Sequence, residues 1–211
     1  MHSPDQAPQQ PFDLKTLADG NDGDVVLMTH ISAGDAKAFE ILVERHQHAV
    51  VGTVAKMLGS PNDAEDIAQQ VFLRVWKSAP RYKPTAKFTT WLFTITRNLV
   101  FNECRRRYRH HEVSMDERED DHHQQTADES QVRPDDITLQ AELQDAIDAA
   151  INALPEKQRL ALVLRRYEDL PYEEIGKILN LSLPAVKSIL FRARSQLKEL
   201  LKPYLEANPN T

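Results

Sequence analysis

The chain has 211 residues, of which 41% are hydrophobic and 27% are charged, and its formal net charge is −6. This length and composition suit one large or two small domains with buried cores. They argue against a membrane-inserted protein, because the chain contains no run of about 18 apolar residues.

The sequence excludes several kinds of site. With Cys104 as its single cysteine, the chain has no disulfide framework and no paired-cysteine zinc site. Its six glycines form none of the Gly-rich loops that bind nucleotides. Residues 1–24 are rich in Pro, Gln, Asp and Gly and lack the pattern of a secretory signal. We therefore expect a disordered N-terminal extension on a cytoplasmic protein.

Charge is segregated along the chain. Residues 37–111 carry 13 Lys and Arg against six acidic residues, whereas residues 112–148 carry two against 13. Residues 149–211 are again basic, with ten against seven. Two basic segments separated by an acidic one indicate two nucleic-acid-binding units, which the acidic overall charge conceals.

Residues 25–111 are predicted to form the first domain. Their apolar residues recur at spacings of three and four, which is typical of amphipathic helices. A Gly-Ser-Pro-Asn tetrapeptide breaks the first long helix, so we expect Asp63 to cap the second helix, with Asp66 as the acid of a capping box. Residues 80–86 read as a loop, and a third helix is expected from Lys87.

The loop and the third helix interleave aromatic and basic residues. Rings of this kind stack on unpaired bases while cations follow the phosphates, so the pattern suits single-stranded DNA. Phe72 and Trp91 are more simply explained as core aromatics. The predicted strand-binding residues are Tyr82, Lys83, Lys87, Thr89, Thr90, Arg97, Asn98, Asn102 and Arg105.

Residues 112–138 are acidic, rich in His and Gln, and without apolar periodicity, so we predict a flexible linker. Zinc-binding residue types do lie in and beside it. We nevertheless expect no metal site, because one thiolate and scattered histidines are more simply solvated. The residues concerned are Cys104, His110, His111, His122 and His123.

Residues 139–205 are predicted to form a second helical domain, followed by a short tail at 206–211. Residues 171–200 have the shape of a helix-turn-helix: a short helix, a polar turn and a longer helix. The longer helix has an apolar stripe formed by Val186, Leu190, Ala193 and Leu197. Its other side is polar and basic, as reading a DNA groove requires, with Ser182, Lys187, Ser188, Arg192 and Arg194 as the predicted contacts.

No segment alternates with a period of two, so the predicted fold is all-α: two small helical domains joined by a flexible acidic linker. Two motif sets then resemble a bacterial RNA polymerase sigma factor of the extracytoplasmic-function (ECF) group. Asp63–Trp76 is similar to the polymerase-binding part of region 2, and Phe88–Leu99 to its promoter-melting part. Leu154–Arg159 and Val186–Leu197 resemble region 4.

The resemblance implies a transcription initiation factor, which is not an enzyme and needs no cofactor. Region 2 would bind the clamp helices of the largest polymerase subunit, through Asp63, Asp66, Gln69 and Phe72. It would also capture unpaired bases of the −10 promoter element. Region 4 would bind the flap of the second-largest subunit and read the −35 element. A stress or envelope-response regulon, and control by an anti-sigma factor, are typical of the group.

The chain departs from the family pattern at a few positions that bear on DNA contacts. Thr89 replaces a frequent basic residue, and Pro184-Ala185 replaces a common Gly-Thr pair. Ile189 and Phe191 stand where Arg and His are frequent. The loss of an Arg that made a bidentate base contact would relax discrimination by roughly 1–3 kcal/mol.

Two other functions compete with this interpretation. A helix-turn-helix regulator that is not a polymerase subunit would use only the second domain, and it leaves the motifs of residues 63–109 unexplained. A metal-dependent nuclease would use Asp63, Glu65 and Asp66, but the first two of these do not face one point at a helix start. Only a sigma factor would convert core polymerase into a promoter-specific enzyme.

Overall fold

The computed structural model describes residues 20–116 and 136–207, which are almost entirely helical and contain no strand. The predicted all-α class is confirmed. The helices are α1 (Asn21–Ser32), α2 (Ala36–Leu58), α3 (Pro61–Ser78), the short 3-10 helix η2 (Ala79–Arg81), α4 (Phe88–Asp116), α5 (Asp136–Asn152), α6 (Glu156–Arg166), α7 (Tyr172–Leu179) and α8 (Leu183–Ala207). Within these residues, no helix is long and apolar enough to cross a membrane.

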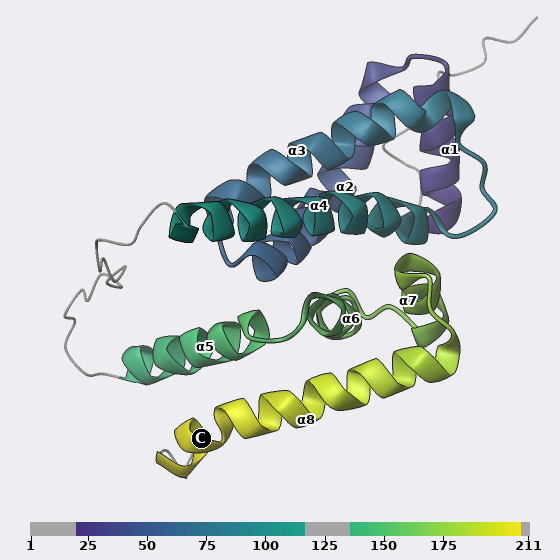
Figure 1. The fold of residues 1–211 in the computed structure, drawn as a ribbon. Coiled ribbons are helices and arrows are strands. Elements are labelled where there is room, and N and C mark those ends of the chain that lie inside the picture. The colour runs from purple at the N-terminus through teal and green to yellow at the C-terminus, as the bar shows by residue number, and fades with distance from the viewer. Residues whose placement is uncertain (1–19, 117–135, 208–211) are drawn as a thin grey trace, which may run out of the picture.

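The first domain consists of α1 to α4. A break before α2 separates it from α1, and there the Asp35 side chain caps α2 by accepting from the backbone N–H groups of Lys37 and Ala38 at 2.9 and 3.1 Å. Gly59 ends α2 in the left-handed conformation, with φ 65°. The turn that follows aligns α3 along α2, and α4 then packs on both (Figure 1).

The expected start of α3 was wrong by three residues. The helix begins at Pro61, after Ser60 as the N-cap residue, and not after Asp63. Proline is favoured at the first helical position because its missing N–H would have no partner there. Asp63 is therefore the third helical residue, where its carboxylate makes a hydrogen bond with Ser60. Asp66 lies nearly one turn further along and does not complete a capping box.

The second domain contains the predicted helix-turn-helix in α7 and α8. Asn180 ends α7 in the left-handed conformation, with φ 54°. Gly176 allows the turn to approach closely, because a Cβ there would lie 2.8 Å from the Leu181 carbonyl oxygen. On α8, Val186, Leu190 and Ala193 are buried as predicted, and α5 lies along the same helix.

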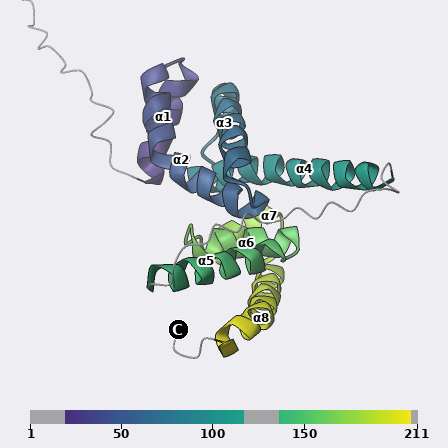
Figure 2. The ribbon, with the colours of Figure 1, turned by 90° about the vertical axis from the view of Figure 1, so that its left-hand side faces the viewer.

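The two domains are stacked on each other, which both perpendicular views show (Figures 1 and 2). Helices α2 and α4 of the first domain face α5, α6 and α7 of the second, and buried residues of both form one continuous hydrophobic cluster. Helices extend into the segment predicted as linker from both sides, because α4 reaches Asp116 and α5 begins at Asp136. The rest of that segment lies outside the described residues.

Candidate functional site

An apolar groove runs between α2 and α3. It has a volume of about 590 Å³, and its lining includes Phe39, Val43, Val51, Gln69, Phe72 and Leu73. Leu73 is 55% exposed and adds to the apolar surface that the groove presents to solvent. The groove is therefore a surface suited to an amphipathic partner helix.

The four residues predicted to bind polymerase divide between two faces of α3. Gln69 and Phe72 line the α2–α3 groove, although Phe72 is only 6% exposed and contributes to its floor. Asp63 and Asp66 instead border a polar depression between α3 and α4. Sequence analysis missed Leu73, whose one signal was its position four residues after Gln69, on the same helical face.

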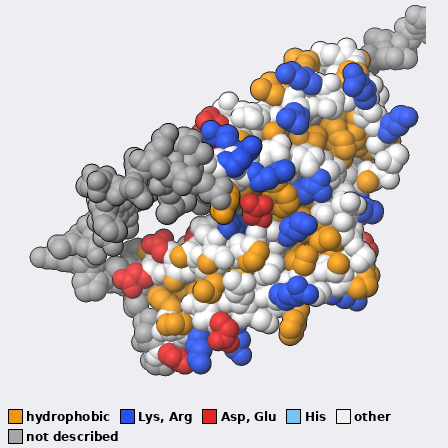
Figure 3. Space-filling model, in the orientation of Figure 1, with side chains coloured by type: hydrophobic (Ala, Val, Ile, Leu, Met, Phe, Trp, Pro, Cys, Tyr) orange, Lys and Arg blue, Asp and Glu red, His pale blue; other side chains and the backbone are white. Residues whose placement is uncertain are grey.

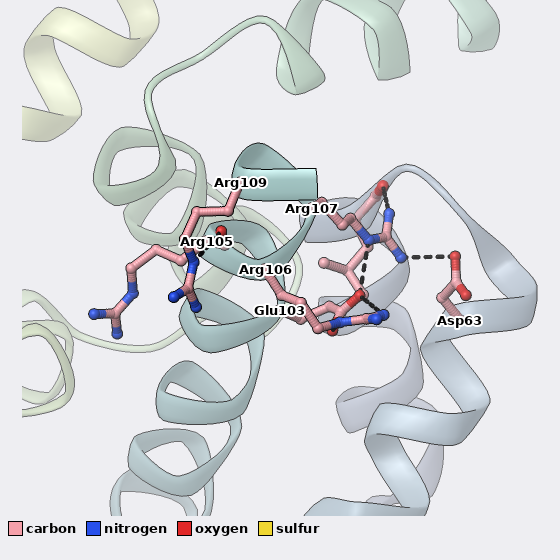
Figure 4. Close-up of polar contacts among 7 residues, drawn as sticks. Asp63, Glu103, Arg105, Arg106, Arg107 and Arg109 are labelled. Carbon is pink, nitrogen blue, oxygen red and sulfur yellow. Dashed lines mark hydrogen bonds and ion pairs between the residues drawn. The ribbon is translucent and has the colours of Figure 1, made fainter. Parts of the chain in front are cut away.

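Asp63 is held within the chain by an ion-pair network, which Figure 4 shows. Arg107 lies 2.6 Å from the Asp63 carboxylate and 3.0 Å from Glu103, and it also donates to the Leu58 carbonyl at 3.1 Å. Hydrogen bonding to Ser60, followed by the charge of Arg107, lowers the pKa of Asp63. Hydrogen bonding from Arg106 likewise lowers the pKa of Glu103. Asp63 thus links the start of α3 to α4 through Arg107.

The arginine run at the end of α4 has two kinds of member. Arg106 and Arg107 are ion-paired to acidic residues, whereas Arg105 and Arg109 project from the other side of the helix (Figure 4). Arg105 donates to Asn102 at 2.8 Å and is exposed, and Arg109 is exposed beside it. Neither forms an ion pair within the described ranges, so no paired carboxylate compensates their positive charges, which suits contacts with phosphates.

The loop before α4 rests on an aromatic cluster. The Tyr82 ring lies 4.9 Å from that of Trp91 and 6.2 Å from that of the fully buried Phe88, measured between centroids. Burial raises the pKa of Tyr82. Lys83 and Lys87 stand exposed at the rim. Tyr82 therefore supports the loop from below, while the lysines face outward.

Helix α1 supports the same loop, which the sequence did not reveal. The Asn21 side chain accepts from the backbone N–H of Phe88 at 2.8 Å and so caps the start of α4. Asp24, only 1% exposed, contacts His46 at 3.0 Å and Arg45 at 3.4 Å, and the His46 ring lies 5.1 Å from that of Phe88. A segment that begins within the predicted disordered extension thus positions the loop.

Two predicted strand-binding residues face the second domain. Thr90 is 3% exposed and donates to the Glu174 carboxylate, and Arg97 donates to the Ile178 carbonyl. Of the remaining residues in that set, Asn98 and Asn102 are exposed and Thr89 is half-buried. The structure therefore separates this set into members open to solvent and members covered by α7.

The outward face of α8 and the turn before it carry the residues predicted for groove reading. Ser182, Lys187, Arg192 and Arg194 are exposed, and Ser188 is half-buried, where it accepts a hydrogen bond from Arg192 at 3.2 Å. Phe191 stands among them with 71% of its surface exposed. Sequence analysis noted Phe191 as a departure from the family pattern but gave it no role. In the orientation of Figure 3, Lys and Arg side chains are spread over the visible face of both domains.

No cluster of metal-ligating residues occurs in the described part of the chain. Cys104 is half-buried, and burial raises the pKa of its thiol. The histidine side chains considered above for zinc lie outside the described residues.

Comparison with protein families gives two matches in the order expected. The model described as Sigma-70 region 2 matches residues 42–110, and the one described as Sigma-70, region 4 matches residues 144–197. The first spans most of α2, all of α3 and much of α4, and the second spans the helix-turn-helix.

Two relatives that match most of this chain are also sigma factors. The RNA polymerase sigma-H factor of Pseudomonas aeruginosa is 30% identical, over 86% of this chain and 95% of its own length. The ECF RNA polymerase sigma factor SigW of Bacillus subtilis is 33% identical, over 82% and 93%.

Two solved structures are also similar. The sigma factor RpoE of Bartonella quintana, in complex with the anti-sigma factor NepR, superposes with a TM-score of 0.61 at 26% identity, over 79% of this chain and 98% of that one. CnrH, in complex with the cytosolic domain of CnrY, has the same fold, with a TM-score of 0.64 at 23% identity over 85% and 97%.

Proposed function

Because this chain belongs to the ECF group of RNA polymerase sigma factors, we propose that it directs core polymerase, in the cytoplasm, to promoters of a stress or envelope-response regulon. Polymerase carries the chemistry, and this chain supplies recognition without a catalytic group or cofactor. The observation that carries the proposal is that two exposed surfaces of different chemistry lie on separate domains: an aromatic loop with basic flanks on the first, and a helix with an exposed basic face on the second.

The outward face of α8 is assigned to the −35 element. A helix in the major groove reads base edges with polar side chains and anchors on phosphates with cations, and α8 exposes both kinds. Phe191 adds an apolar ring at the centre of this face, where it suits the methyl group of thymine. The departure at Phe191 then exchanges polar readout for apolar readout, whereas Ile189 packs against the hydrophobic core and does not take part.

The loop before α4 and the exposed side of α4 are assigned to the unpaired −10 strand. Lys83, Lys87 and Arg105 supply cations, and Asn98 and Asn102 supply donors and acceptors for base edges. The rings beneath the loop give it a rigid base, which a pocket for an extruded nucleotide requires.

The α2–α3 groove is assigned to the clamp helices of the largest polymerase subunit. Its apolar lining, with Leu73 projecting and Gln69 at its rim, fits a helix laid lengthwise. The flap of the second-largest subunit would meet the second domain. Asp63 and Asp66 border the depression between α3 and α4 and do not line this groove, so their contact with polymerase stays a separate prediction.

Reconstitution tests the assignment. Purified core polymerase with this protein should transcribe a small set of genomic fragments that core alone does not. Leu73→Glu should reduce core binding at least about tenfold, because it places a charge in an apolar contact. Gln70→Glu, at an exposed residue of α3 that faces away from the groove, is the control and should bind core normally. Sequence-specific DNA binding without any polymerase-dependent transcription would instead favour the operator-binding regulator.

A further inference from the structure

Helix α1 reaches the start of α4 through two polar side chains. Asn21 and Asp24 are three residues apart in this helix, so they lie on one face of it. Asn21 accepts from the backbone N–H of Phe88 at 2.8 Å and so fixes the main chain where the loop becomes helix. Asp24 reaches the Phe88 side chain through His46 of α2. One turn of α1 therefore acts on both the backbone and the ring of a single residue.

The link through His46 begins at a buried charge. Asp24 is 1% exposed, and its two carboxylate oxygens lie 3.0 Å from Nε2 of His46 and 3.4 Å from the Arg45 guanidinium. A buried carboxylate needs partners of this kind, so the contact restricts rotation of the His46 ring. That ring lies 5.1 Å from the Phe88 ring, measured between centroids. The position of the Phe88 ring is therefore set from α1 by way of α2.

The aromatic rings beneath the loop carry this position to the loop itself, which comprises residues 82–87. The Phe88 ring lies 5.8 Å from that of Trp91 and 6.2 Å from that of Tyr82. The Tyr82 hydroxyl is buried and has no hydrogen-bond partner among the described residues, although an unpaired buried hydroxyl costs free energy. Tyr82 is thus held by the packing of its ring and not by its polar end. Because Tyr82 and Phe88 stand at the two ends of the loop, the shape of the loop follows the Phe88 ring.

We propose that Asn21 and Asp24 are positioning residues for strand capture: without touching DNA, they hold residues 82–87 in the shape that receives the unpaired strand. The proposal rests on the assignment of this loop to the −10 strand. Lys83 and Lys87, both exposed, can direct their charges at one stretch of backbone only while the loop keeps a fixed shape. A loop that is already ordered also loses less conformational entropy on binding. Loosening the loop therefore lowers affinity for a single strand without removing any contacting group.

Two helix caps of the first domain provide a matched comparison in the full-length protein. Asn21→Ala removes the side chain that caps α4, and Asp35→Ala removes the one that caps α2, beyond the opposite end of α1. The loss of either cap lowers stability by a comparable amount, so a merely structural role predicts equal effects on binding. We expect only Asn21→Ala to weaken binding of a fluorescein-labelled dT20 oligonucleotide, roughly threefold to tenfold by fluorescence anisotropy. Asn21→Asp keeps an acceptor at this position and should retain the parental affinity.

The link through His46 is tested by a change of charge. Asp24→Asn keeps the size of the side chain but removes the charge, and Asp22→Asn makes the same change at an exposed residue of the same turn. The chain has two tryptophans, so 5-fluorotryptophan labelling gives one fluorine resonance for Trp91 in the ring cluster and one for Trp76 outside it. Asn21→Ala and Asp24→Asn should both shift the Trp91 resonance, whereas Asp22→Asn should not. If Asp24→Asn fails to fold, the comparison of the two caps decides alone.

Equal affinities of Asn21→Ala and Asp35→Ala for dT20, or an unchanged Trp91 resonance in Asn21→Ala, would overturn the positioning role. A parent protein without measurable affinity for dT20 would overturn it as well. The reconstituted transcription assay separates this proposal from the proposed function. If Asn21→Ala alone loses dT20 affinity but the parent protein directs no transcription by core polymerase, the positioning role stands and the promoter function fails. If the parent directs transcription while the two cap variants bind dT20 equally, the function stands and the positioning role is wrong.

Discussion

The two helices that we propose to contact DNA, α4 and α8, present their polar residues in different ways. On α8 the predicted contacts lie opposite a buried apolar stripe, and most are open to solvent. On α4 the predicted contacts are distributed around the helix, some exposed and some covered by the other domain. When a helix buries one face within its own domain, its sequence periodicity predicts which residues are exposed. When a helix lies between two domains, periodicity does not predict which of its residues the other domain covers.

The largest effect should come from breaking the scaffold that presents α8. Gly176→Ala would place a Cβ 2.8 Å from the Leu181 carbonyl oxygen, so the turn between α7 and α8 must shift. We expect the free energy of unfolding to fall by about 2–3 kcal/mol. Gly52→Ala in α2, where no atom lies within 4 Å of the added Cβ, should be neutral or stabilising. Chemical denaturation followed by circular dichroism measures both, and equal effects would contradict the close approach.

The next effect concerns groove reading itself. Arg192→Ala should weaken binding of the polymerase holoenzyme to duplex promoter by about 1–2 kcal/mol. If Arg192 contacts a phosphate, the slope of the logarithm of affinity against the logarithm of salt concentration should also fall by about one. Lys202→Ala, near the end of α8 and 3.8 Å from Glu206, is the control. On a template whose −10 region is already unpaired, Arg192→Ala should not affect capture of the single strand. A defect confined to the pre-melted template would reverse the assignment of the two helices.

A third test separates neighbouring arginines on α4. Arg107→Ala breaks the contacts to Asp63, Glu103 and the Leu58 carbonyl, and because these sites are partly exposed we expect a loss of only about 1 kcal/mol in unfolding free energy. Arg105→Ala should leave stability unchanged but reduce promoter opening, which permanganate footprinting of unpaired thymines reports. If Arg105→Ala is the destabilising variant, the division of the arginine run is wrong.

The smallest effect concerns Glu168 at the domain interface. Burial raises its pKa, although Thr53 donates to it. A raised pKa means that the folded state favours the protonated acid. The Glu168 side chain therefore stabilises the folded protein below its ordinary pKa of 4.5, and this stabilisation is lost as the pH rises through the raised pKa. Glu168→Gln should therefore stabilise the protein at neutral pH by less than about 1 kcal/mol, with no gain at low pH. Thermal melts of both proteins at neutral and at low pH measure the difference in stability. A variant that is more stable than the parent only at low pH would contradict the raised pKa of Glu168.

Much of the fold followed from the sequence, because amphipathic periodicity depends on residues close in the chain. The stripe from Val186 to Ala193 is an example. The start of α3 did not follow, because Ser60 and Asp63 are both good capping residues and only Pro61 decides between them.

The candidate site was less predictable than the fold. The burial of Thr90 depends on Glu174, 84 residues away, and no local pattern carries that information. The exposure of Leu73 likewise emerges only once the surrounding helices are packed.

The contact between Asn21 and Phe88 has a consequence for how the protein can be divided. The region 2 match begins at residue 42, yet the cap of α4 comes from a residue about 20 positions upstream of it. The boundary at which family resemblance begins is therefore not the boundary of the cooperative folding unit. A fragment cut at the family boundary would leave the first N–H group of α4, that of Phe88, without its partner and would expose the residues that α1 covers. Dissection of the first domain must therefore retain the chain from residue 20 onward.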